Sequence, residues 1–255
     1  MQWDKDNFNT GIMIYTDGSC YKDMVGASAV LYIDGVERDS LKYQLGSKHS
    51  HTVFEGELVG IILGSHLAEA HPRPAATTNF SIDNQAAIQS MQNNSRQPAQ
   101  YLIDEIHRCT EVLQRSKTAR QQQQEENQEE YNPDGKAISS ISFTWVAGHE
   151  GSTGNERSDT LAKEAAQHGS SPIEDLPTFL HQRLPASISA IKQSITADIK
   201  RQVKEWWRRS PRSIKMRHID PSLPSDNYLK ITNKLNRRQT SLLTQLRTGH
   251  APLNK

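Results

Sequence analysis

The stretch "FTWVAGHEGSTGNERSDTLAKEAA", residues 143–166, joins three local patterns. Its first residues are apolar and β-favouring, which is typical of a buried strand. A glycine-rich loop follows. The segment "RSDTLAKEAAQHG", residues 157–169, then has helical character and ends at Gly169, a residue type that commonly terminates helices. A strand that leads through a loop into a helix is the building unit of an α/β sheet.

The preceding residues repeat this alternation of short apolar runs and amphipathic segments. The hydrophobic period predicts strands at residues 11–16, 26–35, 36–45, 78–83 and 138–148, and helices at residues 52–71, 84–92, 98–113 and 157–169. Asp34-Gly35 is a hairpin turn signal between the second and third strands. The order β-β-β-α-β-α-α-β-α predicts an α/β fold with a five-stranded mixed sheet flanked by helices.

Charge is distributed unevenly along the 255 residues. Residues 1–170 contain 14 Lys+Arg and 23 Asp+Glu, whereas residues 171–255 contain 16 Lys+Arg and 6 Asp+Glu. The first part therefore carries −9 and the second +10. A basic segment favours polyanions such as nucleic acid, and the alternative is that these charges only keep a helical tail soluble.

Composition excludes several classes of protein. The mean hydropathy is −0.73, and no apolar run approaches the roughly 18 to 20 residues that span a membrane. The N-terminus lacks the apolar stretch of a signal peptide. Cys20 and Cys109 are the only cysteines, too few for a disulfide framework or a thiolate metal site. We therefore expect an intracellular protein, in the nucleus or the cytoplasm, that is not associated with a membrane.

The chain is expected to have three parts: an N-terminal tail at 1–10, the α/β domain at 11–170, and a basic, mostly helical tail at 171–255. Residues 116–136, rich in Gln and Glu, contain too few apolar side chains to order themselves, which predicts a flexible insertion or a helix extension. Trp206 and Trp207 lie near arginines in the tail. They would either stack on nucleic-acid bases or dock a helix on its neighbour.

Carboxylates recur at the ends of the predicted elements. Asp17 and Asp83 each follow a short apolar strand, and sites in open α/β sheets form at the carboxyl ends of strands. Glu57 lies early in the helix 52–71 among apolar neighbours, and Asp159 opens the last helix. Such acids would repel one another without cations. Oxygen-only ligands suit Mg²⁺, with Mn²⁺ as the alternative, and two such ions can clamp a phosphodiester during hydrolysis.

Some of these residues also have a plainer interpretation. Asp17, Gly18 and Ser19 could simply close a hairpin. His149 lies in the glycine-rich loop ten residues before Asp159. It could transfer a proton or help the product to leave, and the alternative is an ordinary surface histidine.

The motifs "YTDGSC", "FEGEL", "FSIDNQAA" and "FTWVAGHEGSTGNERSDTLAKEAA" resemble those of type 1 ribonuclease H, over about residues 10–170. The resemblance implies the ribonuclease H fold and a D-E-D-D metal site made by Asp17, Glu57, Asp83 and Asp159, with His149 as the loop histidine. It also implies endonucleolytic cleavage of the RNA strand of an RNA/DNA hybrid. The products would carry 5′-phosphate and 3′-hydroxyl ends.

The resemblance has a second, narrower part. "FEGELVGIILG" and "NRRQTSLLTQLRTGHAPLNK" are similar to the ribonuclease H region of fungal-type non-LTR retrotransposon polyproteins. In those proteins a Cys/His segment usually follows, whereas this sequence ends at Lys255 before any such cysteine. We therefore expect a fragment or remnant of an element, with a reverse transcriptase as a partner in the full-length version.

Substrate contacts follow from the same resemblance. A hybrid-specific enzyme must detect the 2′-hydroxyls of one strand. The backbone near Gly18, Ser19 and Cys20 and the side chain of Asn84 are candidates, and their plainer roles are a turn and a helix N-terminus. Bacterial relatives carry a basic, Trp-containing protrusion where residues 91–100 of this chain, "MQNNSRQPAQ", have one Arg and no Trp. The basic tail is a possible substitute, because phosphate contacts supply much of such affinity.

Three rival functions stay open at this point. Another nuclease or transposase on the same fold would share the sheet and the acids, since fold does not determine function. The histidine loop with Asn155, Glu156 and Arg157, which are expected to cap and brace the last helix, argues against that. A domain that only binds nucleic acid is the second rival. The third is a regulatory protein organised by the Gln/Glu-rich segment.

Overall fold

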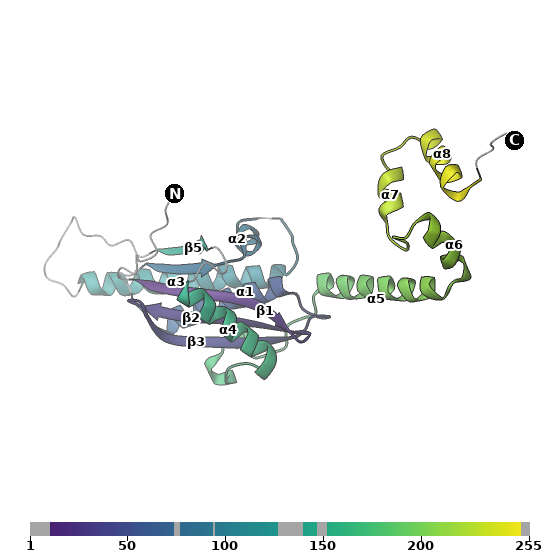
Figure 1. Ribbon diagram of the computed structural model, residues 1–255. Coiled ribbons are helices and arrows are strands. Elements are labelled where there is room, and N and C mark those ends of the chain that lie inside the picture. The colour runs from purple at the N-terminus through teal and green to yellow at the C-terminus, as the bar shows by residue number, and fades with distance from the viewer. Residues whose placement is uncertain (1–10, 74–76, 94, 127–139, 147–151, 251–255) are drawn as a thin grey trace. The chain divides into compact units, whose positions relative to one another are not determined.

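The computed structural model describes residues 11–73, 77–93, 95–126, 140–146 and 152–250 (Figure 1). The chain divides into two compact units, Met1–Lys192 and Gln193–Lys255. We call them the N-terminal unit and the C-terminal unit and describe each by itself.

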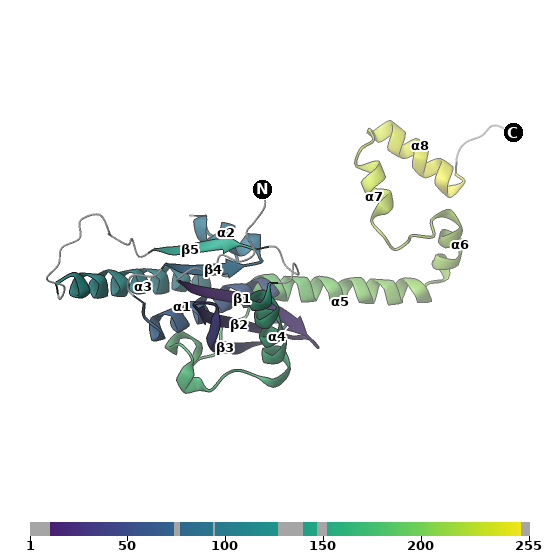
Figure 2. The same ribbon diagram turned by 60° about the vertical axis from the view of Figure 1, so that its left-hand side comes forward.

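The N-terminal unit is built on one sheet. Its strands are β1 (Ile12–Tyr21), β2 (Met24–Ile33), β3 (Val36–Ser47), β4 (Thr78–Ile82) and β5 (Ile141–Trp145). Their spatial order is β3-β2-β1-β4-β5, with β1, β2 and β3 antiparallel and β1, β4 and β5 parallel. Figure 2 shows β4 between β1 and β5. The predicted α/β fold with a five-stranded mixed sheet is confirmed.

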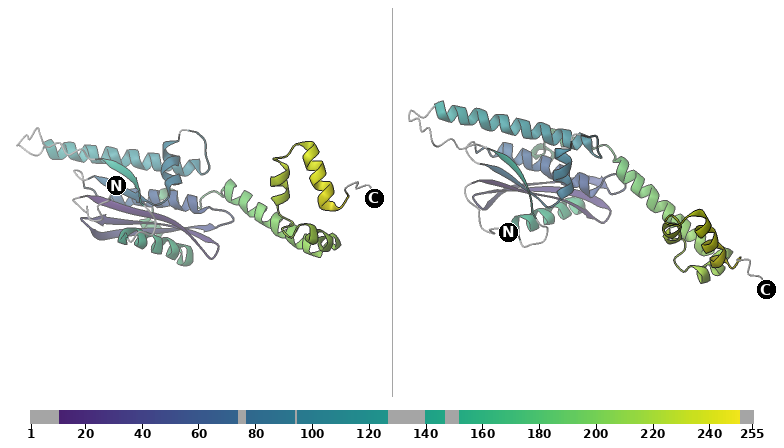
Figure 3. Two further views of the ribbon diagram at one scale, coloured as in Figure 1. Left: turned by 45° about the horizontal axis from the view of Figure 1, so that its top comes forward. Right: turned by 90° about the horizontal axis from the view of Figure 1, so that it is seen from above.

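Helices cover both faces of this sheet. They are α1 (Val53–Ala70), α2 (Gln85–Gln92), α3 (Gln100–Glu126) and α4 (Thr153–His168), followed by short 3₁₀ turns at Ile173–Asp175 and Thr178–Leu180. The right-hand view of Figure 3 shows α1 and α3 on one side of the sheet and α4 on the other. The three-layer arrangement buries both faces of the inner strand β2, which is almost entirely buried, whereas the edge strands β3 and β5 keep exposed residues.

Successive side chains of a strand point to opposite faces of the sheet, so each face has its own apolar core. Ile12 and Ile14 of β1 join the main core beneath α1, together with Phe80 and the apolar residues of α1 and α3. Met13 and Tyr15 alternate with them along β1 and face the other side, where Tyr15 joins a smaller cluster with Leu161 of α4. The rigid centre of the sheet, β1, is thereby fixed from both sides.

Several boundaries differ from the sequence-based expectation, and those of β1, α4 and α3 affect the interpretation. Strand β1 continues to Tyr21 because β2 pairs with it throughout, so Asp17 lies within the strand. The interpretation of Asp17, Gly18 and Ser19 as a turn is therefore wrong. The hairpin turns instead at Lys22 and Asp23, which both have positive φ.

The last helix, α4, starts at Thr153, so Asp159 lies in its second turn and does not open it. Helix α3 continues through the first part of the Gln/Glu-rich segment to Glu126. The helix-extension alternative describes that part, and residues 127–136 lie outside the described residues.

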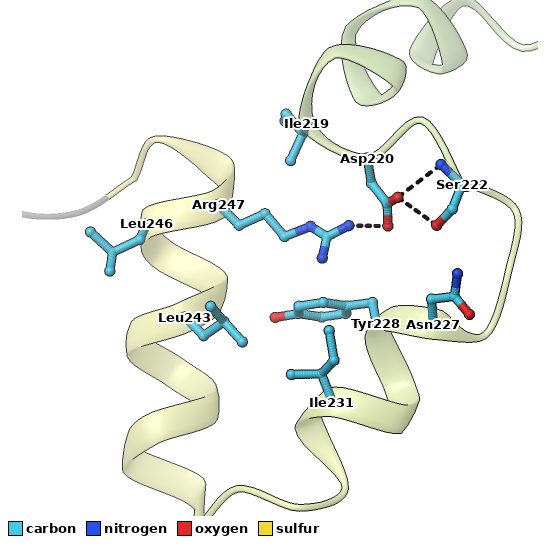
Figure 4. Close-up of a pocket in the computed structure, with 9 residues that line it drawn as sticks. All are labelled: Ile219, Asp220, Ser222, Asn227, Tyr228, Ile231, Leu243, Leu246 and Arg247. Carbon is cyan, nitrogen blue, oxygen red and sulfur yellow. Dashed lines mark hydrogen bonds and ion pairs between the residues drawn. The ribbon is translucent and has the colours of Figure 1, made fainter.

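The C-terminal unit consists of helices joined by short loops. They are α5 (Ile188–Arg209, which begins in the N-terminal unit), α6 (Pro211–Ile219), α7 (Asn227–Thr232) and α8 (Arg237–Thr248). Asp220, after α6, forms an ion pair with Arg247 of α8 and accepts two hydrogen bonds from Ser222 (Figure 4). The Arg247 guanidinium lies 4.3 Å from the centre of the Tyr228 ring. These contacts line a cavity of about 500 Å³ that α6, α7 and α8 share.

No helix among the described residues is long and apolar enough to cross a membrane. Cys20 and Cys109 are both free, the first exposed and the second partly buried.

Candidate metal centre

The register of two parallel strands places Asp17 beside Asp83. Thr16 of β1 pairs with Ile82, the last residue of β4, and the two aspartates are the next residue of each chain segment. They therefore lie side by side where the parallel pairing ends. This is the sheet edge at which sites form in α/β proteins.

Glu57 reaches the same place because α1 begins in close contact with β1. Thr52 caps the helix, since its hydroxyl accepts from the backbone N–H of Glu55 at 3.2 Å and the Glu55 carboxylate accepts from the Thr52 N–H at 2.7 Å. Glu55 is thus used in the cap, and Glu57 is left to face the sheet.

Glycine makes the close contact of α1 with β1 possible. A Cβ on Gly18 would lie 2.6 Å from the carbonyl carbon of Gly56 and 2.8 Å from the Val53 carbonyl oxygen, closer than real Cβ atoms approach. No larger residue fits at this position without moving the helix and Glu57 with it.

Three carboxylates meet in this arrangement. Asp17, Glu57 and Asp83 each offer one oxygen, and these oxygens lie within 4.8 Å of one another. Asp17 and Glu57 are buried. Asp17 Oδ2 and Glu57 Oε2 have no hydrogen-bond partner among the described residues. Buried carboxylate oxygens without partners destabilise a fold unless a cation neutralises them, so the cluster fits a hard divalent ion.

Electrostatics in the ion-free structure point the same way. Burial, followed by the charges of Asp83 and Asp159, raises the pKa of Asp17 to about 7. Burial, followed by the charges of Asp17 and Asp83, raises the pKa of Glu57 to about 9. The Lys163 charge opposes the first shift and an Asn84 hydrogen bond the second. A bound cation would stabilise both ionised forms and lower both pKa values.

Asp159, the fourth predicted ligand, lies outside this three-residue group. Its carboxylate forms an ion pair with the Lys163 ammonium at 2.6 Å, one helical turn further along α4. It is nevertheless close enough to raise the pKa of Asp17. His149 lies outside the described residues.

The predicted substrate contacts lie around the cluster. Gly18 is buried, Ser19 is half-buried and Cys20 is exposed. Beyond Thr16, β1 pairs with β2 alone, because its pairing with β4 has ended. This stretch of backbone therefore forms an edge next to the acids among the described strands.

Asn84 has the plainer of its two suggested roles, since its side chain accepts from the Ala87 N–H at 3.2 Å and caps α2. Its amide also hydrogen bonds to Glu57 and lowers that pKa. The two roles are compatible, because a side-chain amide has one acceptor oxygen and two N–H donors.

Two further residues at the site were not predicted from the sequence. Lys163 could have been found, because it follows Asp159 by four residues on one helix face. Trp145 donates its indole N–H to the Asp83 carbonyl at 3.0 Å, and it is paired with Ile82 across β4 and β5. That contact depends on strand register, which the local sequence does not reveal.

The RNase H family model matches residues 9–167, more than half of the chain. The chain belongs to the RNase H family. Membership supports ribonuclease H activity, and the family match includes all three clustered acids and Asp159. No curated protein matches the chain significantly.

Solved structures with a similar arrangement include three ribonucleases H. RNase H1 from Halobacterium salinarum is 18% identical, with a TM-score of 0.42, over 61% of this chain and 97% of its own. The N-terminal RNase H domain of a Mycobacterium tuberculosis protein is 15% identical, with a TM-score of 0.43, over 63% and 96%. LC11-RNase H1 in complex with an RNA/DNA hybrid is 15% identical, with a TM-score of 0.39, over 61% and 96%.

Proposed function

We propose that this chain hydrolyses the RNA strand of RNA/DNA hybrids endonucleolytically and leaves 5′-phosphate and 3′-hydroxyl ends. Asp17, Glu57, Asp83 and Asp159 would hold two divalent cations, Mg²⁺ or alternatively Mn²⁺. The observation that supports this most is the convergence of three acids with two unpartnered buried oxygens. A pair of ions at such a site activates the attacking water and stabilises the leaving oxygen.

The residues of the chain have separate tasks in this proposal. Asp17 and Glu57 would bind cations in their deprotonated forms. Their raised pKa values mean that, in the ion-free protein, deprotonation requires a higher pH than for an ordinary carboxyl. Asp159 supplies the fourth carboxylate after it leaves the Lys163 ammonium. His149 transfers a proton or assists product release.

Strand recognition would take place beside the acids. The open edge of β1 at Gly18, Ser19 and Cys20 and the amide of Asn84 offer backbone and side-chain groups to the 2′-hydroxyls of the RNA strand. Such contacts would let the site distinguish an RNA strand from a DNA strand.

The test is cleavage of a hybrid labelled on each strand, beside duplex DNA and duplex RNA, with Mg²⁺ and with Mn²⁺. Asp83→Asn should lower the rate by at least about 10³-fold, because it removes a ligand but preserves volume. Asp104→Asn is the matched control, since Asp104 is exposed on α3 and bonds only to Gln100 among the described residues.

Two outcomes would count against the proposal. Cleavage of duplex DNA would favour another nuclease on this fold. Absence of cleavage by a folded chain with either metal would favour a domain that only binds nucleic acid.

We also propose a retrotransposon origin, which rests on "FEGELVGIILG" and "NRRQTSLLTQLRTGHAPLNK". A reverse transcriptase would then be encoded in the same element. Sequencing of the genomic DNA and transcripts around the coding region should find reverse-transcriptase coding sequence. Its absence at every copy of the locus would contradict this origin.

A further inference from the structure

A second cavity is lined only by residues of the C-terminal unit. It measures about 440 Å³ and is formed by α5, α6 and the loop after α6. Its lining combines cations with an aromatic ring: Arg201, Lys204, Arg208 and Arg217 surround Trp207, with Glu205 as the one carboxylate. Leu223 and Pro224 complete the wall.

The charges of this cavity are not balanced from within. Arg201 forms an ion pair with Asp198 at 2.9 Å, and Arg217 donates to the Ser213 hydroxyl at 3.2 Å. Lys204 and Arg208 have no ion pair among the described residues. Even with Asp198 counted beside Glu205, four cations face two carboxylates, and this excess of positive charge favours a polyanion.

The aromatic part of the site is also incomplete. Trp207 Nε1 is buried, and no atom of the described residues accepts its hydrogen bond. A buried donor without an acceptor destabilises the fold unless a ligand supplies one. Trp206 precedes Trp207 on α5, with the two ring centroids 6.4 Å apart, and it is 66% exposed. The pair therefore offers one donor without an acceptor and one ring face without a neighbour.

We propose that this cavity binds single-stranded nucleic acid. Lys204 and Arg208 contact phosphates, the Trp207 N–H donates to a phosphate or base oxygen, and a base stacks on Trp206. A single strand fits better than a duplex because its bases are free to stack on a side chain. The site goes beyond hybrid cleavage and does not depend on it, although it could hold a strand that extends from a hybrid.

The test measures binding of a fluorescent oligodeoxythymidylate of about 12 nucleotides, within the usual site size of ~4 to 16. The full chain is used without divalent cations. K204Q/R208Q should bind at least about 10-fold more weakly. The slope of log affinity against log salt should fall by about 1.4, because each phosphate contact on a single strand contributes about 0.7.

The matched control is K230Q/R238Q, which removes two exposed charges of α7 and α8 that do not line the cavity. It should change the affinity by less than about 3-fold. Trp207→Phe keeps the ring and removes the donor, and it should weaken binding by about 3- to 10-fold. Circular dichroism checks that each variant keeps its helices. If Trp207→Phe loses its helices, the test rests on K204Q/R208Q, which changes two exposed side chains.

Equal losses in K204Q/R208Q and K230Q/R238Q would overturn the proposal, since they would show only general attraction to a basic unit. Binding to vesicles of anionic lipid without binding to the oligonucleotide would also overturn it. Because cleavage is not measured, these outcomes are independent of the proposed ribonuclease activity.

Discussion

The two units of the chain differ in how they are held together. The N-terminal unit buries a continuous apolar core on the α1 side of its sheet and a smaller cluster under α4. In the C-terminal unit, among residues 193–250, Ser213 and Asp220 are the only buried residues, and neither is apolar. Apolar burial is the main stabilising contribution to a fold. The first unit can therefore offset the unfavourable free energy of buried, mutually repelling carboxylates, and the second cannot. A site for a flexible strand needs no such rigidity.

Hydrogen exchange should show the largest contrast between the units. Amides of β1 and β2 are expected to exchange at least about 10³-fold more slowly than those of α6, α7 and α8, because only global unfolding exposes the central strands. Mass spectrometry of peptic peptides would measure this. Similar protection in both units would contradict the comparison of their cores.

A matched pair of glycine substitutions should show the next largest difference between the units, in the free energy of unfolding. A Cβ on Gly26 would press into the Ala162 carbonyl and lie 2.5 Å from Ala166 N, so Gly26→Ala should cost about 3 kcal/mol or more. Gly249 ends α8 with φ +71° and open space around it. Gly249→Ala should therefore cost only about 1 kcal/mol. Urea unfolding followed by circular dichroism measures both, and equal costs would show that α4 is not in backbone contact with β2.

Asp17→Asn should stabilise the metal-free protein by about 2 kcal/mol at neutral pH, or about 5 °C in Tm. The folded pKa of Asp17 is raised to about 7, so its contribution to stability is present below pH 4 and is lost as pH rises toward 7. The variant should not show that part of the loss. Thermal unfolding with chelator between pH 4 and 9 tests this, with Asp104→Asn as the control. The same dependence of Tm on pH in the variant and the parent chain would show that the pKa of Asp17 is not raised in the folded protein.

Asp220 should show the opposite and smallest dependence. Hydrogen bonds from Ser222 and the charge of Arg247 lower its pKa below the ordinary value. Its contribution is therefore present at neutral pH and is lost as pH falls below about 4. Asp220→Asn should reduce the helicity of residues 211–248 slightly at pH 7 and not at pH 3. Circular dichroism at both values measures it, and an equal effect at both would exclude the Arg247 ion pair.

The sequence predicted the sheet and the positions of Asp17 and Asp83 at its edge because both depend on local signals. The hydrophobic periods of strands and helices predict these elements from the sequence, and an acid directly after a short strand indicates the carboxyl edge of the sheet. The length of β1 was not readable, because Gly18, Ser19 and Cys20 carry no alternating apolar pattern and only pairing with β2 keeps them extended. The same holds for the Trp145 contact and the Trp207 cavity, which join segments that are brought together by the fold.

The most direct test of the account measures kcat and KM for hybrid cleavage separately, in one variant of the N-terminal unit and one variant of the C-terminal unit. With a hybrid that has a single-stranded overhang, Asp83→Asn should lower kcat by at least about 10³-fold while the hybrid still binds. K204Q/R208Q should raise KM severalfold and leave kcat within about 2-fold. Cleavage that persists in Asp83→Asn, or a kcat that falls with the Lys204 and Arg208 charges, would contradict the assignment of chemistry to the N-terminal unit and strand binding to the C-terminal unit.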